Sequence, residues 1–518
     1  MFKVSKTNGK KKKAIHQKPT SKSTTTKNTS KNKNVKAPLG PYGFTSEGRK
    51  KRILLNAFDM NGIGHTSVGQ WQNPIDKSKT KNTLEYWIEL AKLLEKGKFN
   101  ALFLADNFGS HEIYQDSHAP AIKAGAQWPL YDPFVIVTAM AAVTKSLGFG
   151  ITACTTFEPP FLLAKRFSSL DHLTKGRIAW NIVTSWADSA ARAMGLEALP
   201  EHDERYLIAE EYLQLIYKLW EGSWADDALV LDPISSTFAN PDKVKRIEHR
   251  GKYFKCVSAH QVDPSPQRTP LLFQAGMSPA GASFGSKHAE CIFIGGPNPS
   301  FVGEKIKQTR ALAASQGRNP YDLNFFISFT PVLAATDAEA QAKLEEYKKY
   351  SILDGSLAKF CGISGIDLAK WGLDEEFPTD PKHPSLAHLN SKQREVLTNR
   401  PDGYMNWSPR ILGEWSAIGG SSPFQVGSGE TVADELERWI RVADVDGFNV
   451  GHVVVPQAWK DVIEFLIPVL EKRGWLGEAN EYSVPGGTLR ENLYRTPGDS
   501  RLRPSHPGSA FKFDKLHR

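Results

Sequence analysis

The sequence predicts a closed (β/α)8 barrel with long insertions and a C-terminal extension. Short apolar runs alternate with segments of helical periodicity along most of the chain. Eight such strand–helix units can be traced, and this number fits a closed barrel better than an open sheet. Polar residues directly follow several of the apolar runs, as they do at the carboxyl rim of a barrel, where active sites are built.

The chain begins with a Lys/Ser/Thr-rich tail, residues 1–45, which we expect to be disordered. The formal net charge is +9, but residues 1–40 contain twelve lysines and no acidic residue, so the rest of the chain carries a net charge of −3. The folded part is therefore not expected to bind nucleic acid. Lys10 to Lys13 could form a nuclear-import or polyanion patch, although a solubilising extension is the simpler interpretation.

The first half of the barrel is predicted from four apolar runs that are bounded by polar or glycine-rich segments. These strands span residues 52–58, 101–105, 147–154 and 177–183. The helices that follow them span 83–96, 132–145, 161–173 and 205–222. Thr83 and Gly97 are the start and stop signals of the first helix.

The second half repeats this alternation. Its strands span residues 270–275, 289–294, 323–329 and 447–455, and its helices 280–288, 300–316, 431–443 and 459–473. Two excursions, 223–268 and 354–429, are too long for a βα connection and are interpreted as insertions. They are rich in Trp, Phe and Tyr, which suits a lid and substrate pocket or an oligomer interface. The barrel is thus expected within 50–475, with a C-terminal extension at 476–518.

Several functional classes are disfavoured by what the sequence lacks. It contains no run of about 18 apolar residues, so no membrane span is expected. The first residues lack the apolar core of a secretory signal, and the four cysteines form no CxxC pair, which favours a reduced, intracellular and cytoplasmic setting. GxxxxGK[ST] and HExxH are absent. Histidines 65, 111, 202 and 452 show no paired ligand spacing, so no metal site is predicted.

Two helix starts predict an anion site. His202 and Tyr206 are four residues apart at the start of a helical segment, where backbone N–H groups favour an anion. The segment QAGMSPAG, residues 274–281, runs from a strand through Ser278 into another helix. Ser278 before a proline is by itself an ordinary N-cap. Because both helix starts belong to one rim, we interpret them together as a phosphate site.

The residues that follow the predicted strands are expected to meet at the same rim. They are Phe58, Asp106, Thr155, Thr184, Ser278 and His452. Simpler roles remain open for some of the candidates. Asp106 could cap its own loop, Asn181 could satisfy a backbone group within the barrel, and His65 and Trp71 could be ordinary loop packing. Their shared placement at strand ends favours a functional site.

Many segments, in order, resemble one branch of the bacterial-luciferase-like flavin monooxygenases. That branch contains the nitrilotriacetate, dibenzothiophene-sulfone, EDTA and long-chain-alkane monooxygenases. The resemblance covers about residues 50–510. It is carried by NAFDMNGIGH with GQW, EYWIELAKLLEKGKFNALFLAD, TTFEPPFLLAKRFSSLDHLTKGRIAWNIVTS, HDERY with AEEYL and LWEGSW, HRGKYF, PSPQRTPLLFQAGMSPAG, DGFNV and TLRENL.

The resemblance implies a barrel that binds reduced FMN, supplied by a separate NAD(P)H:flavin reductase, and reacts it with O2. The resulting flavin peroxide would oxygenate a small organic substrate, and the assembly would be a homodimer or homotetramer. The implied site residues fall into three groups. The Met277 amide, Ser278, His202 and Tyr206 would hold the FMN phosphate; Asp106, Thr155, Thr156 and Asn181 would surround the isoalloxazine ring; His65, Gln127 and His452 would lie on the substrate side as hydrogen-bonding or proton-transfer groups.

One position departs from the family pattern. In alkane-oxidising members a cysteine lies three residues before the histidine of the first loop, and this chain has Gly62 there. This departure argues against an alkane substrate. Two alternatives stay open, namely a deazaflavin-dependent oxidoreductase of the same barrel superfamily and a catalytically silent flavin-binding or structural barrel.

Overall fold

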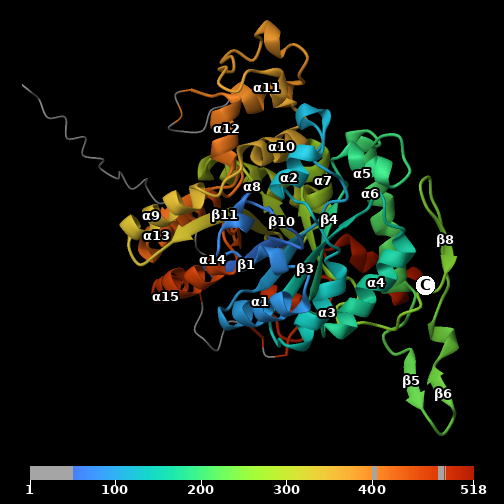
Figure 1. Cartoon of the computed structure of the whole chain (residues 1–518). Coiled ribbons are helices and arrows are strands. Elements are labelled where there is room, and N and C mark those ends of the chain that lie inside the picture. The colour runs from blue at the N-terminus through green and yellow to red at the C-terminus, as the bar shows by residue number, and fades with distance from the viewer. Residues whose placement is uncertain (1–50, 399–403, 405, 477–482, 485) are drawn as a thin grey trace, which may run out of the picture. The chain divides into compact units, whose positions relative to one another are not determined.

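The computed structural model describes residues 51–398, 404, 406–476, 483–484 and 486–518. The predicted tail, 1–45, and part of the predicted C-terminal extension lie outside these residues. Eight parallel strands form the central sheet (Figure 1). They are β1 (Leu54–Met60), β2 (Ala101–Ala105), β3 (Gly148–Cys154), β4 (Ile178–Val183), β9 (Leu271–Ala275), β10 (Cys291–Ile294), β11 (Asn324–Leu333) and β13 (Gly447–Val450).

The sheet closes on itself. Its order is β10–β9–β4–β3–β2–β1–β13–β11, and β11 pairs in turn with β10. At the junction of the two ends of the chain, Leu54 lies opposite Gly447 and Ala57 opposite Val450. The predicted (β/α)8 barrel is confirmed. Because every strand runs in the same direction, all carboxyl ends lie at one rim.

Helices cover the outside of the barrel (Figure 1). They are α1 (Leu84–Lys96), α3 (Phe134–Ala142), α4 (Pro160–Leu173), α6 (His202–Tyr217), α7 (Pro279–His288), α8 (Pro299–Ser315), α13 (Gly429–Ala443), α14 (Gln457–Asp461) and α15 (Ile467–Lys472). α6 begins at His202, three residues before the predicted start, and continues as a π-helical turn over Lys218–Gly222. β13 ends at Val450, so His452 lies in the following loop and not in a strand.

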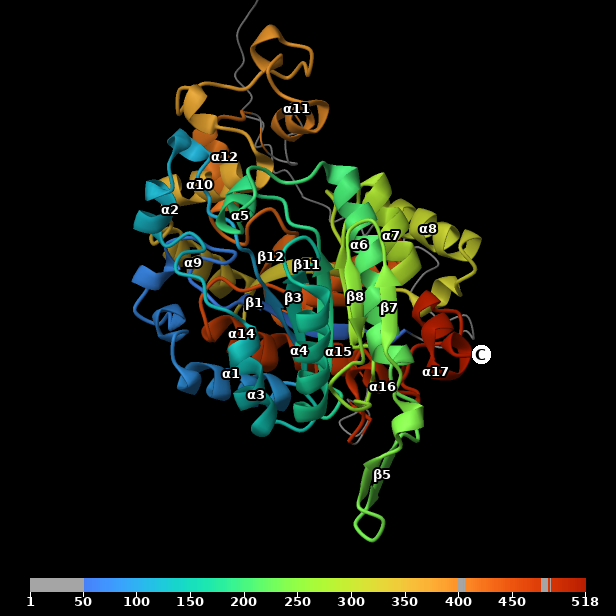
Figure 2. The same cartoon turned by 90° about the vertical axis from the view of Figure 1, so that its right-hand side faces the viewer.

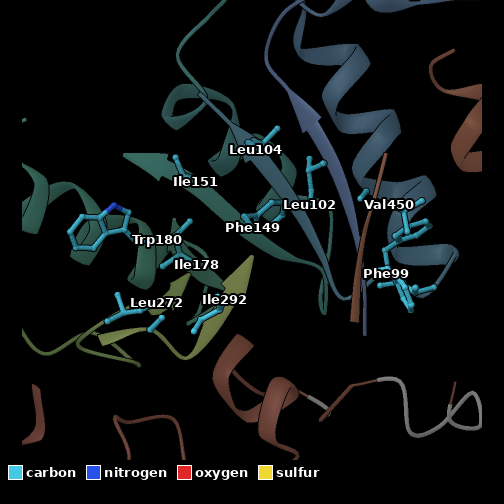
Figure 3. Close-up of a cluster of buried hydrophobic side chains, with 14 of the residues drawn as sticks. Phe99, Leu102, Leu104, Phe149, Ile151, Ile178, Trp180, Leu272, Ile292 and Val450 are labelled. Carbon is cyan, nitrogen blue, oxygen red and sulfur yellow. The ribbon is translucent and has the colours of Figure 1, made fainter. Parts of the chain in front are cut away.

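The strands pack their outward side chains against the helices in level rows. Leu102, Phe149 and Ile178 are neighbours across β2, β3 and β4, and Leu104, Ile151 and Trp180 form the next row (Figure 3). All six are buried. This outer layer is the main hydrophobic core of the barrel.

The barrel interior is filled by phenylalanines from alternate strand positions. Ring centroids lie 5.7 Å apart for Phe58 and Phe103, 5.2 Å for Phe103 and Phe273, and 5.6 Å for Phe273 and Phe326. A Cβ at Gly150 would lie 3.0 Å from the Phe103 ring, so the glycine gives that ring its space. The prediction that Phe58 follows its strand is wrong, because β1 extends to Met60 and Phe58 points into this interior.

The insertion at 223–268 forms two antiparallel hairpins. They consist of β5 (Leu229–Asp232) with β6 (Thr237–Ala239), and β7 (Ile247–Arg250) with β8 (Lys255–Ser258). In Figures 1 and 2 the β5–β6 hairpin projects downward from the barrel. A short helix that was not predicted, α5 (Asp188–Ala193), precedes α6.

The insertion at 354–429 lies at the opposite, upper end in both views (Figures 1 and 2). It contains α10 (Leu353–Ser364), α11 (Ser391–Thr398), α12 (Pro409–Ser416) and β12 (Phe424–Gly427). α10 packs on α12 and on α2 (Ala119–Ala124) around a core of its own. β12 extends the sheet beside the end of β11, with Phe424 opposite Thr330. The preceding helix, α9 (Asp337–Lys348), was not predicted, although its capping box of Thr336 and Glu339 is visible in the sequence.

The C-terminal extension closes the amino end of the barrel. Its helices include α16 (Leu489–Tyr494) and α17 (Phe513–Leu516). Arg490 and Glu290 are both buried and form a bidentate pair, Nε to Oε1 at 2.7 Å and Nη2 to Oε2 at 2.8 Å. Leu489 packs into the barrel interior. Within the described part of the chain, no helix is long and apolar enough to cross a membrane.

We expect Arg490→Met to lower the free energy of unfolding by about 3–5 kcal/mol, because it leaves the buried Glu290 carboxylate without a countercharge. The matched control is Arg410→Met, which removes an ion pair whose side chains are 40% and 71% exposed, and should cost less than about 1 kcal/mol. Urea denaturation measures both. Equal losses in the two variants would show that the Arg490 pair does not hold the extension.

Candidate active site

The starts of α6 and α7 meet at Tyr206. Ser278 is the N-cap of α7, and its Oγ accepts a hydrogen bond from the Gly281 N–H at 3.1 Å. A Cβ at Gly276 would lie 2.8 Å from Tyr206 Oη, and one at Gly281 would lie 2.7 Å from it. The two glycines therefore let the phenol approach the first turn of α7. The N-cap role of Ser278 is present, and the Tyr206 hydroxyl lies against the same turn.

Tyr206 is held as a neutral hydrogen-bond donor. Burial raises the pKa of its phenol, against the opposing effects of the Ser278 and Thr184 hydroxyls. His202 lies one helical turn before it, with ring centroids 5.3 Å apart. The His202 side chain is half exposed, and its Nδ1 lies 2.7 Å from Asp203 Oδ1. His202 thus lies at the same helix start, where its ring contacts Asp203.

Two further residues organise this corner. Arg205, which sequence reasoning missed although it lies inside the HDERY motif, donates through Nη1 to the Ser185 carbonyl. It thereby holds the loop after β4 against the start of α6. The Met277 sulfur accepts from the Gly295 N–H at 3.3 Å, which links the loops after β9 and β10. The side chains predicted to hold an anion therefore follow three strand ends.

Asp106, Thr155 and Thr156 lie at the ends of β2 and β3, as predicted. Asp106 Oδ1 accepts from the Asn107 N–H at 2.9 Å, so it does cap its own loop. Burial raises the Asp106 pKa to about 7. Thr155 Oγ1 donates to Val183 O at 3.3 Å, and Thr156 Oγ1 donates to the Thr184 carbonyl at 2.9 Å. Both threonines therefore tie the end of β3 to the end of β4.

Asn181 lies inside the barrel on β4. Its Nδ2 donates to Thr152 Oγ1 at 2.9 Å, so it satisfies a side-chain hydroxyl and not a backbone group. Its Oδ1 is buried and has no hydrogen-bond partner among the described residues. A buried amide oxygen without a donor is the kind of group that a ligand N–H satisfies.

A buried charge network lies below the first loop. Asp59 Oδ1 is 2.6 Å from Lys81 Nζ and 2.9 Å from His452 Nε2. Burial alone would raise the Asp59 pKa, but Lys81 and His452 outweigh it and hold that pKa below its usual range. The His65 ring lies 5.9 Å from the His452 ring between centroids. Burial lowers the His65 pKa well below 6.5, so His65 is neutral at physiological pH.

This network brings His65 and His452 together, as predicted, and adds Asp59 and Lys81, which sequence reasoning missed. Lys81 belongs to the stretch KSKTK, whose composition is typical of a solvated loop. The donor atoms of Asp59, His65 and His452 lie within 4.8 Å of one another, close enough to consider a metal. A bound cation would be repelled by the Lys81 ammonium, which already pairs with Asp59. The cluster is therefore better suited to holding protons.

Gln127 connects His65 to a further buried histidine. Its Oε1 lies 2.9 Å from His111 Nε2, and its Nε2 donates to the His65 carbonyl at 3.3 Å. Burial lowers the His111 pKa to about 4, so that ring is neutral. Gln127 has φ of 54°, a left-handed conformation that is uncommon for a residue other than glycine and is frequent at functional sites.

A cavity of about 960 Å³ opens beside His65 and Gln127. This volume suits a small organic molecule. Most of its wall comes from the insertion at 354–429, and no lining residue comes from 223–268. The lining residues of the insertion are Lys359, Phe360, Ile363, Ser364, Glu395, Val396, Trp407, Trp415, Ser416 and residues 419–422. The two insertions, predicted as joint candidates for the lid and pocket, therefore differ in their relation to the cavity.

The glycines of the first loop serve close packing. A Cβ at Gly62 would lie 2.7 Å from Pro129 O, where the chain forms an isolated bridge to Leu130. Gly64 has φ of 70°, and a Cβ there would lie 2.0 Å from the Gly125 carbonyl oxygen. A cysteine at position 62 would thus require the loop to move.

Comparison with known proteins gives consistent matches over most of the chain. The profile of the family described as "Luciferase-like monooxygenase" matches residues 65–444. The dimethyl-sulfide monooxygenase of Hyphomicrobium sulfonivorans is 42% identical over 465 residues, which are 89% of this chain and 94% of the relative. The long-chain alkane monooxygenase of Geobacillus thermodenitrificans is 40% identical over 463 residues, 89% and 98% of the two chains. The nitrilotriacetate monooxygenase component A of Aminobacter aminovorans is 30% identical over 466 residues, 88% and 100%.

Solved structures match this chain over a similar extent. The crystal structure of DmoA from Hyphomicrobium sulfonivorans matches with a TM-score of 0.82 and 41% identity, covering 89% of this chain and 96% of that one. A crystal structure of a riboflavin lyase with modified FMN and riboflavin matches with a TM-score of 0.79 and 33% identity, covering 89% and 100%.

We expect Asp106→Asn to change how stability depends on pH. The unfolded chain ionises this carboxyl near pH 4 and the folded chain near 7, so the fold loses stability as pH rises between these values and does not regain it above. The variant should therefore be stabilised relative to the parent at pH 8, on the order of 2 kcal/mol, and much less at pH 5. Thermal melts at both pH values measure this, with the exposed Asp242→Asn as control. The same melting difference at both pH values would contradict the raised pKa.

Proposed function

Because this chain belongs to the luciferase-like monooxygenase family, we propose that it uses reduced FMN and O2 to oxygenate a small organic substrate. The profile match covers more than half of the chain, and two relatives named as monooxygenases are 40% identical or more over most of it. The chain is accordingly a flavin-dependent monooxygenase. We propose, in addition, which flavin it uses, where the electrons come from and what class of substrate it oxygenates.

The observation that carries the choice of FMN is the meeting of two helix starts at Tyr206 and Ser278. FMN ends in a phosphate dianion, which suits backbone N–H groups at a helix start together with hydroxyl donors. Gly276 and Gly281 leave room for the Tyr206 hydroxyl at this point. The buried Asn181 Oδ1, which lacks a donor, suits a ring N–H of the flavin. These residues fit the group without rearrangement of the barrel.

The chain's own residues would position the reactants and manage protons. Reduced FMN, when bound, supplies the two electrons that activate O2. Asp59 fixes the His452 ring through Nε2, and Lys81 keeps that carboxylate charged, so His452 can hold or pass a proton beside neutral His65. Gln127 holds the His65 loop through its carbonyl. The aromatic wall of the cavity restricts water around the reacting groups.

A separate reductase is the proposed source of electrons. One relative is named component A of its monooxygenase, which supports a second component that reduces the flavin. In the chain itself, the glycines of GIGH pack against residues 125–130 and are not arranged as a nucleotide loop. The full-length protein should therefore not use NADH until an NAD(P)H:flavin reductase is added.

We further propose a homodimer or homotetramer in which the β5–β6 hairpin takes part. Ile234 and Phe238 of this hairpin are 95% and 68% exposed, and large exposed apolar side chains on a projecting element are typical of an interface. Light scattering of the full chain and of Ile234→Asp checks this: a monomeric parent, or an assembly unchanged in the variant, would exclude the role of the hairpin.

The central test uses the full-length protein, NADH, FMN and a generic flavin reductase under ¹⁸O₂. Candidate sulfones, aminopolycarboxylates, alkanes and nitrogen heterocycles are screened by mass spectrometry for one labelled oxygen atom. Labelled product that requires both the protein and the reductase supports the two-component function. Turnover with NADH in the absence of the reductase would overturn it.

The double variant Ser278→Ala/Tyr206→Phe should weaken binding of reduced FMN by roughly tenfold or more, because it removes two hydroxyls from a phosphate site. Both substitutions leave core volume nearly unchanged, so stability should fall only by the roughly 1 kcal/mol that the lost Ser278 N-cap costs. Anaerobic titration measures affinity, with Tyr321→Phe, which removes the hydroxyl of a tyrosine that is 67% exposed, as control. Unchanged affinity would place the phosphate elsewhere.

A further inference from the structure

The cavity beside His65 contains a buried lysine that the mechanism does not use. Lys359 lies on α10, lines the cavity and is 6% exposed. Its Nζ donates to the His65 carbonyl at 2.9 Å. Among the described residues no other acceptor is in hydrogen-bond range, and no carboxylate pairs with it. Since an ammonium has three N–H donors, two of them are available to a ligand.

Other buried cations of this fold are more fully satisfied. Lys81 has the carboxylate of Asp59, and Arg490 has that of Glu290. Arg177 donates to three backbone carbonyls and to the Thr144 hydroxyl. Lys359, with one carbonyl, is therefore the incompletely satisfied member of this group. A buried charge in such a setting is costly unless a partner completes it.

The remaining wall of the cavity is mostly apolar. Trp407, Trp415, Phe360 and Ile363 line it around Lys359. Among the described lining residues the one carboxylate is that of Glu395, which is exposed. A ligand matched to this wall has an apolar body with a single anionic group at the lysine.

We propose that Lys359 binds an oxyanion of the substrate, a carboxylate or a sulfonate, and so selects small organic acids with an apolar body. The inference rests on the proposed function, because it names the substrate class of the same cavity. The hydrogen bond to the His65 carbonyl places the anion beside the His65 loop, and the apolar body lies along the tryptophan wall. Lys359 thereby sets both the class of substrate and its orientation relative to the barrel rim.

Lys359 is expected to lose its charge at mildly alkaline pH. Burial lowers its pKa to about 8, so the ammonium dominates at pH 7 and is lost by pH 9. The other titratable groups around it are His65 and His111, whose pKa values burial lowers so that both are neutral across this range, and Glu395 at the exposed side. A loss of carboxylate binding between pH 7 and 9 would thus be due to deprotonation of Lys359.

The test measures binding, not turnover, so that its outcome is separate from that of the oxygenation assay. Isothermal titration calorimetry of the full-length protein compares octanoate with 1-octanol, two probes of equal chain length. We expect octanoate to bind at least tenfold more tightly at pH 7, and this preference to disappear at pH 9. An equal or stronger affinity for 1-octanol in the parent protein would overturn the proposal.

Variants separate the charge of Lys359 from a purely structural role. Lys359→Met keeps the length of the side chain and should abolish the preference for octanoate, whereas Lys359→Arg should retain it at both pH 7 and pH 9. Lys370→Met, an exposed lysine of the same insertion, is the control and should behave as the parent. A folded Lys359→Met protein that still prefers octanoate would overturn the proposal. If that variant does not fold, the parent's probe and pH comparisons and Lys359→Arg still decide.

Discussion

The closure of the strand ring is the constraint on which the rest of the structure depends. β1 and β13 come from opposite ends of the barrel sequence, and their pairing brings together residues that are 393 positions apart. Asp59 reaches His452 for this reason, and Asn56 bonds Asn449 one layer below at 2.9 Å. The same geometry makes β4 and β9 neighbours, which is why α6 and α7 can begin side by side. The pairing of the strands therefore determines which residues meet at the candidate site.

Two charged networks lie at opposite ends of the ring, while neutral polar side chains such as Asn56, Asn449 and Asn181 are buried inside it. The phenylalanine interior separates the Lys81–Asp59–His452 network at the carboxyl rim from the Glu290–Arg490 pair at the amino end. At the amino end the charges are fully paired and hold the C-terminal extension in place. Among the described residues, buried atoms without hydrogen-bond partners occur at both ends, for example Gln267 Oε1 near the start of β9. Those at the rim, Asn181 Oδ1 and His65 Nδ1, lie where a ligand could satisfy them.

The parts of this fold that could be predicted from sequence are those encoded by neighbours in the chain. Apolar runs located all eight barrel strands, and β2 was placed to the residue. The four-residue spacing of His202 and Tyr206, and the strand–glycine–serine order around Ser278, are local patterns as well. Asp59, Lys81 and Lys359 were missed because their significance lies in partners that only the closed barrel brings near. Lys359 lies among apolar residues of α10, a signal that becomes informative once that helix is known to be buried.

The division of the site between two parts of the chain has a consequence for how such enzymes diversify. The proposed flavin contacts come from the strand ends of the barrel, whereas most of the cavity wall comes from one continuous segment, 354–429. The hydrophobic core of that segment also includes Val68, Tyr114, Ala121, Ala124 and Ala126. Mutations in that segment can reshape the cavity without touching the phosphate corner at Tyr206. Evolution, or a protein engineer who exchanges this segment between relatives, can therefore vary substrate choice while the oxygen chemistry is inherited unchanged.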